Sequence, residues 1–558
     1  MPRVTHSLSS LVVIAGCFLA SCAAPTPEAV APGSTGAKLY DGLDRYHRAI
    51  TTDSEDAQRW FDQGLQLVFG FNHEEAVRSF KEAAARDPEA AMPWWGIALS
   101  LGMNINDRVM TEERWREAHE AARRALALLD DETEVERALV EAVATRYTWP
   151  APEEQRPYDE AYAEAMKSVH ARFRDDPEVG VLFAESLMNL QPWDYWTNHG
   201  DPKGRTRELV AVIEHVLANQ PDHPGASHLY IHAMEAGPHP ERAEPYADRL
   251  VTRVPGAGHL VHMPSHIYAR VARYGDAADT NARAVAVDQA YLKVAPPPAI
   301  YLVYYAHNLH FLAFASMMEG RYEPAMQAAR QLERDMPEAA LRQLAGLIEG
   351  IMPTTYHVMI RFGRWNEVLA EPLPPDYRLV SRAVYYYARG IALSALGRTD
   401  EARAEVAKFE SAAAAIPGEW FMFNNKVSDV LPIARAMLEG ELAFREGRLD
   451  DAWSALRRGI EAEDRLIYDE PPGWMLPVRH AMGALLMSAG KPAEAERLYR
   501  EDQERHPGNT WSLIGLQKCL AAQNRASEAA AVARQLETAW KRVVDRPTSS
   551  CYCEPGKS

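Results

Sequence analysis

The feature that most constrains the fold of this chain is a helical pattern that repeats about every 34 residues. Apolar residues recur at helical spacing along almost the whole chain, and alternating β-branched runs are few. Helical stretches end where proline follows, as at Asp87-Pro88, Asp176-Pro177, Val254-Pro255, Met336-Pro337 and His506-Pro507. Because one such unit cannot bury its apolar face alone, we expect stacked units that share one continuous core.

The segment that begins at Ala57 shows the pattern most clearly. With Ala57 as position 1, positions 4, 8, 20, 24, 27 and 32 are Trp60, Gly64, Ala76, Phe80, Ala83 and Pro88. This arrangement resembles the tetratricopeptide repeat (TPR), a helix–turn–helix in which small residues let two helices approach and proline ends the second. The resemblance implies an all-α, TPR-like α-solenoid, a right-handed superhelix around a concave groove.

The resemblance covers most of residues 40–540 and is loosest between 110 and 220. Units that begin at Pro224 and Gly258 lie 34 residues apart, and we interpret Trp193–Gly204 and Val294–Tyr305 as insertions. The expected parts are N-terminal repeats over 40–223, central histidine-rich repeats over 224–382, C-terminal repeats over 383–545 and a tail over 546–558.

The N-terminal residues indicate export. Residues 1–21 are typical of a signal peptide, since the apolar segment Leu11–Ala20 is too short to span a bilayer. The run Leu19-Ala20-Ser21-Cys22 resembles a bacterial lipobox, which implies lipidation of Cys22, and Ala23 after it implies the outer membrane. Residues 22–39 are typical of a flexible tether. We expect an outer-membrane lipoprotein that faces the periplasm or the cell surface and touches the membrane only through its lipid.

The net charge limits the kinds of molecule that the protein can bind, and the cysteine content limits its possible disulfides. Lys and Arg number 60 against 78 Asp and Glu, and the resulting net charge of −18 argues against nucleic acid as a partner. Three cysteines remain after the lipid-bearing one, namely Cys519, Cys551 and Cys553. A disulfide from Cys519 to the C-terminal pair is one alternative. The pair Cys551 and Cys553 as a metal site is another, and we favour a loosely ordered tail.

Histidines are concentrated in the centre of the chain. Eight of the 19 lie within residues 228–310: His228, His232, His239, His259, His262, His266, His307 and His310. In the TPR family, positions 2, 5, 9, 12 and 13 of the first helix line the groove. The resemblance therefore implies that all of the eight except His239 face the groove, together with His357 from the unit near Glu349.

Helical spacing leads to the same grouping without the family. His228, His232 and Glu235 stand at i, i+4 and i+7, and His262 and His266 repeat the i, i+4 spacing. His307 and His310 stand at i and i+3. Because packed helices have axes about 8–10 Å apart, these imidazoles can share one ion or two close ions.

The metal expected from such donors is a transition metal. Imidazole binds copper, zinc and iron, and the sequence leaves the choice among them open. The candidate ligands are His228, His232, Glu235, His259, His262, His266, His307 and His310. Glu235 is also the candidate catalytic base. Further candidates for binding a small-molecule or peptide ligand in the groove are Trp95, Glu185, Asn189 and His357.

Three functions follow from these features. The first is an exported, lipid-anchored solenoid whose groove carries a histidine-rich metal site. The second is a metalloenzyme, a metal-dependent oxidoreductase or hydrolase, with its active site in that groove. The third is a metal-free scaffold that binds peptides, as TPR arrays often do. We expect the C-terminal repeats, which lack the histidine pattern, to serve packing or protein contact.

Overall fold

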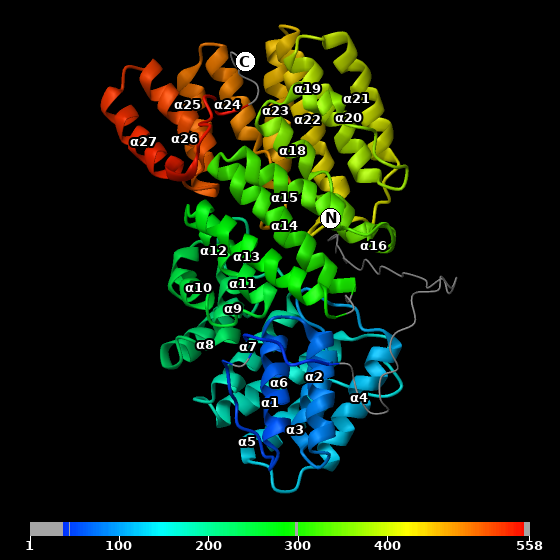
Figure 1. Cartoon of the computed structure of the whole chain (residues 1–558). Helices are drawn as coiled ribbons and strands as arrows, with labels where there is room; N and C mark the ends of the chain where they lie inside the picture. The colour runs from blue at the N-terminus through cyan, green and yellow to red at the C-terminus, as the bar shows by residue number, and fades with distance from the viewer. Residues whose placement is uncertain (1–36, 44, 296–298, 552–558) are drawn as a thin grey trace, which may run out of the picture.

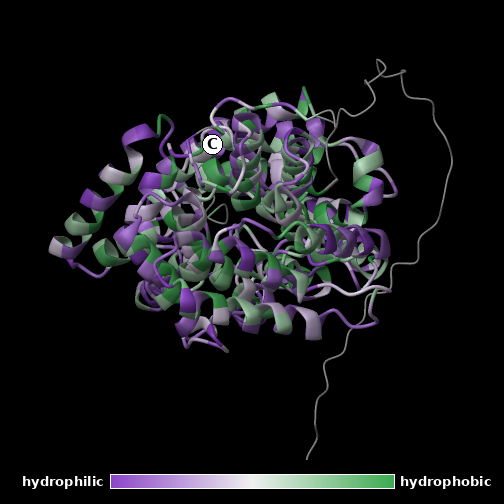
Figure 2. Cartoon of the chain, turned by 90° about the horizontal axis from the view of Figure 1, so that it is seen from below, coloured by the Kyte–Doolittle hydropathy of each residue, from purple (hydrophilic) through white to green (hydrophobic). Residues whose placement is uncertain are grey.

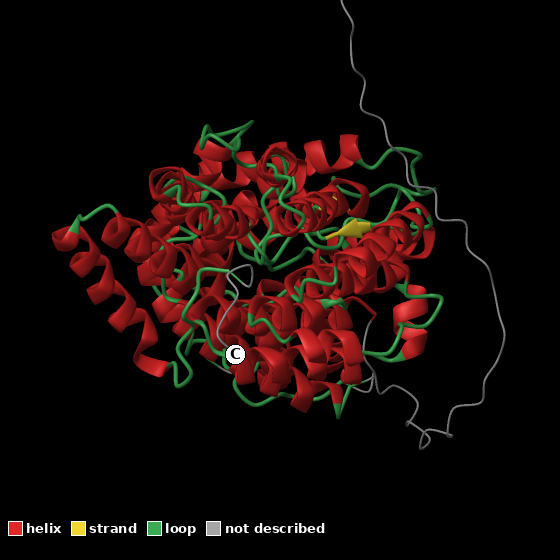
Figure 3. Ribbon diagram, turned by 90° about the horizontal axis from the view of Figure 1, so that it is seen from above, coloured by secondary structure: helices red, strands yellow, loops and turns green. Residues whose placement is uncertain are grey.

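The computed structural model describes residues 37–43, 45–295 and 299–551 of the chain. The expected signal peptide, Cys22, most of the tether and Cys553 lie outside the described residues. Within them the regular elements are helices apart from one short hairpin, in which β1 (Phe421–Met422) pairs antiparallel with β2 (Asn425–Lys426), and an isolated bridge joins Trp196 and Pro202 (Figure 3). None of the helices in the described segments has the length and apolar character needed to cross a membrane.

The N-terminal helices pair in sequence order. They are α1 (Glu55–Phe69), α2 (His73–Arg86), α3 (Ala91–Leu101), α4 (Glu112–Ala127), α5 (Glu134–Ala144), α6 (Arg156–Arg172), α7 (Pro177–Leu190) and α8 (Thr206–Asn219). Side-chain caps explain several starts: the Ser54 side chain accepts from the amide of Ala57, and Asp176 caps α7 just before Pro177. The predicted insertion Trp193–Gly204 forms the irregular connection between α7 and α8.

The central helices contain more breaks. They are α9 (Pro224–Met234), η1 (Pro240–Ala243), α10 (Glu244–Leu250), α11 (Gly258–His262), α12 (Pro264–Arg270), α13 (Tyr274–Leu292), α14 (Ala299–Glu319), α15 (Tyr322–Asp335), α16 (Glu338–Gln343), α17 (Ala345–Ile348), η2 (Glu349–Ile351), α18 (Thr354–Arg361) and α19 (Trp365–Ala370). Residues 299–305 of the expected insertion Val294–Tyr305 lie in α14, which begins at Ala299. Its run of aromatic residues belongs to that long, largely apolar helix.

The C-terminal helices again form hairpins. They are α20 (Leu379–Ala395), α21 (Thr399–Ala414), α22 (Val427–Arg445), α23 (Leu449–Asp464), α24 (Val478–Ser488), α25 (Pro492–Arg505), α26 (Thr510–Ala522), α27 (Ala526–Ala539) and η3 (Trp540–Arg542). Hydrophobic and hydrophilic residues alternate along the same helices, which is typical of amphipathic elements (Figure 2).

The helices of a unit pack closely where the repeat pattern has small residues. A Cβ added at Gly64 or Gly96 would lie within 2.7 Å of the Phe80 ring, so both neighbouring helices need glycine at this contact. Successive helices pack on one another from α1 to α27, with the N-terminal helices below and the C-terminal ones above in Figure 1. The chain is an all-α, TPR-like solenoid, which confirms the prediction from the repeat.

The solenoid also folds back on itself. Helix α1 packs against α9, where a Cβ at Gly225 would lie 2.6 Å from the Phe69 ring. Helix α26 returns to α14, where the Trp511 indole donates to the carbonyl of Met317 at 2.8 Å. These returns close the hollow of the coil, so side chains that line it become interior residues.

Candidate metal centre

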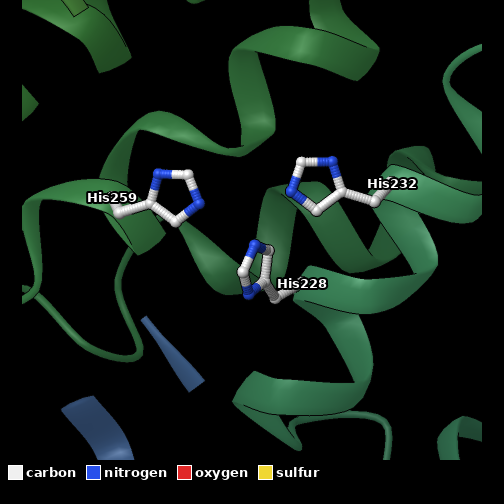
Figure 4. Close-up of side chains that lie close together, drawn as sticks. All are labelled: His228, His232 and His259. Atoms are coloured by element: carbon white, nitrogen blue, oxygen red, sulfur yellow. The ribbon is translucent and has the colours of Figure 1, made fainter. Parts of the chain in front are cut away.

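Six of the predicted histidines converge in two groups of three. The first triad is His228 and His232 of α9 with His259 of α11; the second triad is His262 of α11, His266 of α12 and His307 of α14. In each triad one nitrogen from every ring lies within 4.8 Å of the others. Figure 4 shows the first triad, in which each ring presents one nitrogen toward the space between the rings.

Local helix geometry brings these rings together. His228 and His232 are one turn apart on α9, so both side chains leave the same face. Pro264 divides the first helix of the next unit into α11 and α12, and the division still leaves His262 and His266 in contact. The two triads adjoin, since ring centroids of His259 and His262 are 5.9 Å apart.

Hydrogen bonds fix the proton positions in the second triad. His262 Nδ1 lies 2.7 Å from Asn281 Oδ1, and the Asn281 amide group donates to Ala277, so Oδ1 must accept and Nδ1 must donate. His266 Nδ1 donates to Glu235 at 2.6 Å. Both rings therefore turn Nε2 toward the centre. These two Nε2 atoms are only 2.7 Å apart, and His307 Nε2 is 3.1 Å from that of His262.

Hydrogen bonds from Nδ1 also orient two rings of the first triad. His228 Nδ1 donates to the carbonyl of Phe69 at 2.6 Å, and His232 Nδ1 donates to Glu235 at 2.7 Å. Among the described residues, Nε2 of both rings and both nitrogens of His259 have no hydrogen-bond partner. A buried polar atom without a partner is costly, and a bound metal ion would give these nitrogens a partner.

Glu235 lies between the triads and orients one ring of each. Its Oε1 accepts from His232 and its Oε2 accepts from His266. Burial alone would raise the pKa of this carboxyl, but the neighbouring His266 and His232 lower it to about 2. Glu235 is therefore an ionised anchor for two imidazoles, which is the usual environment of histidine ligands.

Burial favours the neutral form of five of the six rings. His228, His232, His259, His262 and His266 are at most 4% exposed, and His307 is partly buried. Burial, together with neighbouring imidazoles, holds the pKa of His228, His259, His262 and His307 well below the usual value. A neutral imidazole is the form that binds a metal ion, so protons compete little for these nitrogens.

Aromatic side chains from separate loops surround the centre. Phe71 stacks on His232 and His259, Trp193 meets His232 edge-on, and Phe423 of the β1–β2 hairpin packs against His307. Phe71, Trp193 and Phe423 all have positive φ, at 54°, 64° and 52°. Bulky residues rarely adopt this conformation, and such strain is concentrated at functional sites.

The remaining predicted residues lie outside the triads. His310 joins neither; burial and the nearby His357 lower its pKa to about 3. His357 of α18 packs edge-on against Trp474, and Trp95 is buried beside Phe61. Binding of a ligand by His357 or Trp95 stays a prediction.

Glu185 and Asn189 are also buried away from the triads, and they hydrogen-bond to each other at 3.2 Å. The disulfide alternative for Cys519 is wrong: its thiol is free and buried, 3.2 Å from the Met487 sulfur.

Several residues of the centre were not predicted from the sequence. Asn281 and the carbonyl of Phe69 hold two of the rings, and Phe71 and Phe423 cover others. Asn281 left a usable signal, because it is a polar residue that shares a helix face with Ala277, Ala284 and Val285. The Phe69 carbonyl and Phe423 left none, because they reach the centre through the return of the solenoid. The packing role that the sequence predicts for the C-terminal repeats therefore includes the contact of Phe423 with His307.

Comparisons with known proteins add the fold and nothing about the site. No family model matches the chain, and no curated protein matches it. Solved structures similar to it include the human IFIT1 dimer with m7Gppp-AAAA (12% identity, 92% of this chain and 96% of that chain, TM-score 0.33). Others are the APC/C hetero-tetramer Cut9-Hcn1 (12%, 87% and 76%, 0.30) and yeast Tom70 (11%, 87% and 93%, 0.28). These likenesses are too distant to transfer a ligand, including the RNA in the IFIT1 complex.

Proposed function

We propose that the protein is a transition-metal-binding solenoid whose two histidine triads hold two ions side by side. One observation carries the proposal: Nε2 of His262 and of His266 lie 2.7 Å apart although each ring donates its Nδ1 proton to an oxygen. Without a proton or a metal ion between them, two lone pairs at this distance repel. A cation between them replaces the repulsion with two bonds, and small ring rotations would open the nitrogens to the roughly 3.3 Å spacing around a zinc-like ion.

The arrangement around the rings supports the same proposal. In four of the six rings Nδ1 is bound to an oxygen, which leaves Nε2 free to coordinate. The donors are imidazole nitrogens, which suit copper, zinc and iron and not magnesium or calcium. Glu235 then serves as the shared anchor, and we retain it as a positioning residue in place of a ligand or base.

A metalloenzyme at the same site is the second candidate. Each triad supplies three ligands and so leaves a fourth position for water or a substrate, as catalytic sites do. A metal-free peptide scaffold is less favoured, because a peptide in the hollow would have to reach rings that are almost completely buried.

Metal titration of the untagged protein tests the proposal. Chelator-treated protein is titrated with Cu²⁺, Zn²⁺ and Fe²⁺, and bound metal is measured after desalting. We expect two ions per chain for at least one metal, and one ion in either of two variants, His228→Ala/His259→Ala and His262→Ala/His307→Ala. The control is His239→Ala, which removes an exposed histidine that pairs with Glu241. Two ions bound by both triad variants, or none bound by the native chain, would overturn the proposal.

Where the protein works is a separate proposal. Residues 1–21 and Cys22 favour export and a lipid anchor in the outer membrane, with the solenoid on the periplasmic side or at the cell surface. Metabolic labelling with a palmitate analogue tests it. The Cys22→Ser variant should lose the label, whereas the control variant Cys519→Ser should keep it.

A further inference from the structure

The donor set of the centre favours copper among the metals that imidazole binds. None of the described residues supplies a thiolate to either triad, because the free thiol of Cys519 lies beside Met487 and Cys551 is disulfide-bonded. Both oxygens of Glu235 are occupied by imidazole N–H groups. Six imidazole nitrogen donors remain, and nitrogen sites bind copper most tightly among the divalent first-row metals.

The charge of the residues around the two triads favours copper(I) over a divalent ion. Glu235 is the one carboxylate that hydrogen-bonds to any of the six rings within the described part of the chain. Two divalent ions with this single carboxylate would leave three positive charges uncompensated, whereas two copper(I) ions leave one. Burial of uncompensated charge in a low dielectric is costly, so the reduced pair is the better fit.

The two ion positions are adjacent. His232 and His266, which belong to different triads, have ring centroids 5.8 Å apart and share Glu235. Ions in two-metal sites are typically about 3.5–4 Å apart, a distance that one small molecule spans.

The enclosure restricts what can reach the ions. Phe71, Trp193 and Phe423 cover the rings from three different loops, and Phe311 packs edge-on against His262 and His266. These walls are apolar and closely packed, so they favour a small uncharged molecule over a large or ionic substrate.

We propose that this centre, given the two-ion site proposed above, holds a copper(I) pair and binds dioxygen between the two ions. Each copper gives up one electron, and dioxygen accepts both, so that two copper–oxygen bonds form and the oxygen–oxygen bond order falls from two to one. No proton enters or leaves. The two positive charges gained by copper equal the two negative charges gained by oxygen, so the net charge of the buried site does not change. The step therefore avoids a new burial cost.

Oxygen uptake by the copper-loaded full chain tests the proposal. Metal-free protein receives two equivalents of copper(I) without oxygen, is desalted, and is then exposed to dioxygen in an electrode chamber. We expect one dioxygen per two coppers, with both coppers oxidised by their X-ray absorption edge. Protein loaded with two zinc ions, which cannot give up an electron, should take up none.

Variants separate a pair from two independent ions. His259→Ala retains the second triad, and its uptake per copper should fall at least tenfold, because one copper supplies one electron only. If the His259→Ala variant does not fold, His228→Ala replaces it in this experiment. A native chain that holds two copper(I) ions and takes up no more oxygen than the zinc form would overturn this inference and leave the two-ion proposal intact. A native chain that binds no second ion would overturn both.

Discussion

Which nitrogen of each imidazole carries the proton decides whether the ring can bind an ion. Glu235, Asn281 and the carbonyl of Phe69 accept from Nδ1 of four rings, and so turn Nε2 toward the centre. Glu235 has the largest part, because its two oxygens hold one ring of each triad and its low pKa keeps it ionised. A residue that touches no ion thus determines the geometry of both sites.

Glu235→Gln tests this role. The amide oxygen of glutamine can accept from one Nδ1–H only, and its NH₂ group would face the other, so one ring must turn away. We expect the affinity for metal to fall about 10–100-fold, as for other residues that orient ligands. Competition with a chelator of known affinity measures the change. Glu241→Gln, which alters an exposed carboxylate beside His239, should bind metal like the native chain.

His357 gives a prediction about pH and stability. Burial and then the nearby Arg361 lower its pKa from 6.5 to about 3. Its full contribution is present above pH 6.5. As the pH falls below 6.5 the unfolded chain takes up the proton and the folded chain does not, so stability declines by about 1.4 kcal/mol per pH unit. The melting temperature of the metal-free protein should therefore fall less steeply between pH 7 and 5 in His357→Asn than in the native chain. Equal slopes would contradict the burial argument.

Neighbouring helices carry the histidines of the triads, and segments that are distant in sequence pack around them. Helices α9, α11, α12 and α14 carry the six rings, but α1 supplies the Phe69 carbonyl and the β1–β2 hairpin supplies Phe423. The contact of α1 with α9 depends on Gly225, which leaves room for the Phe69 ring. Packing between distant units thus reaches the proposed metal ligands directly.

Gly225→Ala tests that link. The new Cβ would lie 2.6 Å from Phe69, so the helices must separate, which costs about 1–3 kcal/mol. The bond from His228 to Phe69 should weaken with them. We expect a lower melting temperature and weaker binding of one ion only, the one in the first triad. Gly418→Ala is the matched control, because a Cβ there meets no atom within 4 Å.

The same elements show how far the sequence could predict the structure. Periodicity and small residues predicted the helical units, and i, i+4 spacing predicted that the histidines of one helix lie together. The return of α1 to α9 joins residues 159 positions apart, and no local pattern encodes it. The sequence therefore predicted an accessible groove where the chain has a buried centre. The aromatic run after Val294 was assigned to an insertion, because the pattern is interrupted before α14 begins.

For the whole molecule, closure of the coil turns an array of repeats into a shielded site. The hollow that other arrays leave accessible is filled here by α1, the loop with Trp193 and the β1–β2 hairpin. The Trp193 loop also reaches the C-terminal units, where Asn198 donates to the carbonyl of Asp464 at 3.2 Å. Ions bound at the centre would therefore join units that are far apart in sequence.

Metal loading should consequently stabilise the whole chain. An ion that binds only the folded state adds about 2.7 kcal/mol when its free concentration is 100 times the dissociation constant. We expect copper or zinc to raise the melting temperature of chelator-treated protein, and magnesium to leave it unchanged because its preferred ligands are oxygens. Scanning calorimetry measures the shift. A melting temperature that copper and zinc leave unchanged would contradict a pre-formed metal site.

Anomalous X-ray scattering from crystals of the untagged, metal-loaded protein tests the central claim most directly. Data collected on both sides of the absorption edge of the metal locate each ion independently of the protein atoms. We predict two peaks about 3.5–4 Å apart, one bounded by His228, His232 and His259 and the other by His262, His266 and His307. Peaks that lie only elsewhere on the chain, or none at full metal loading, would contradict it.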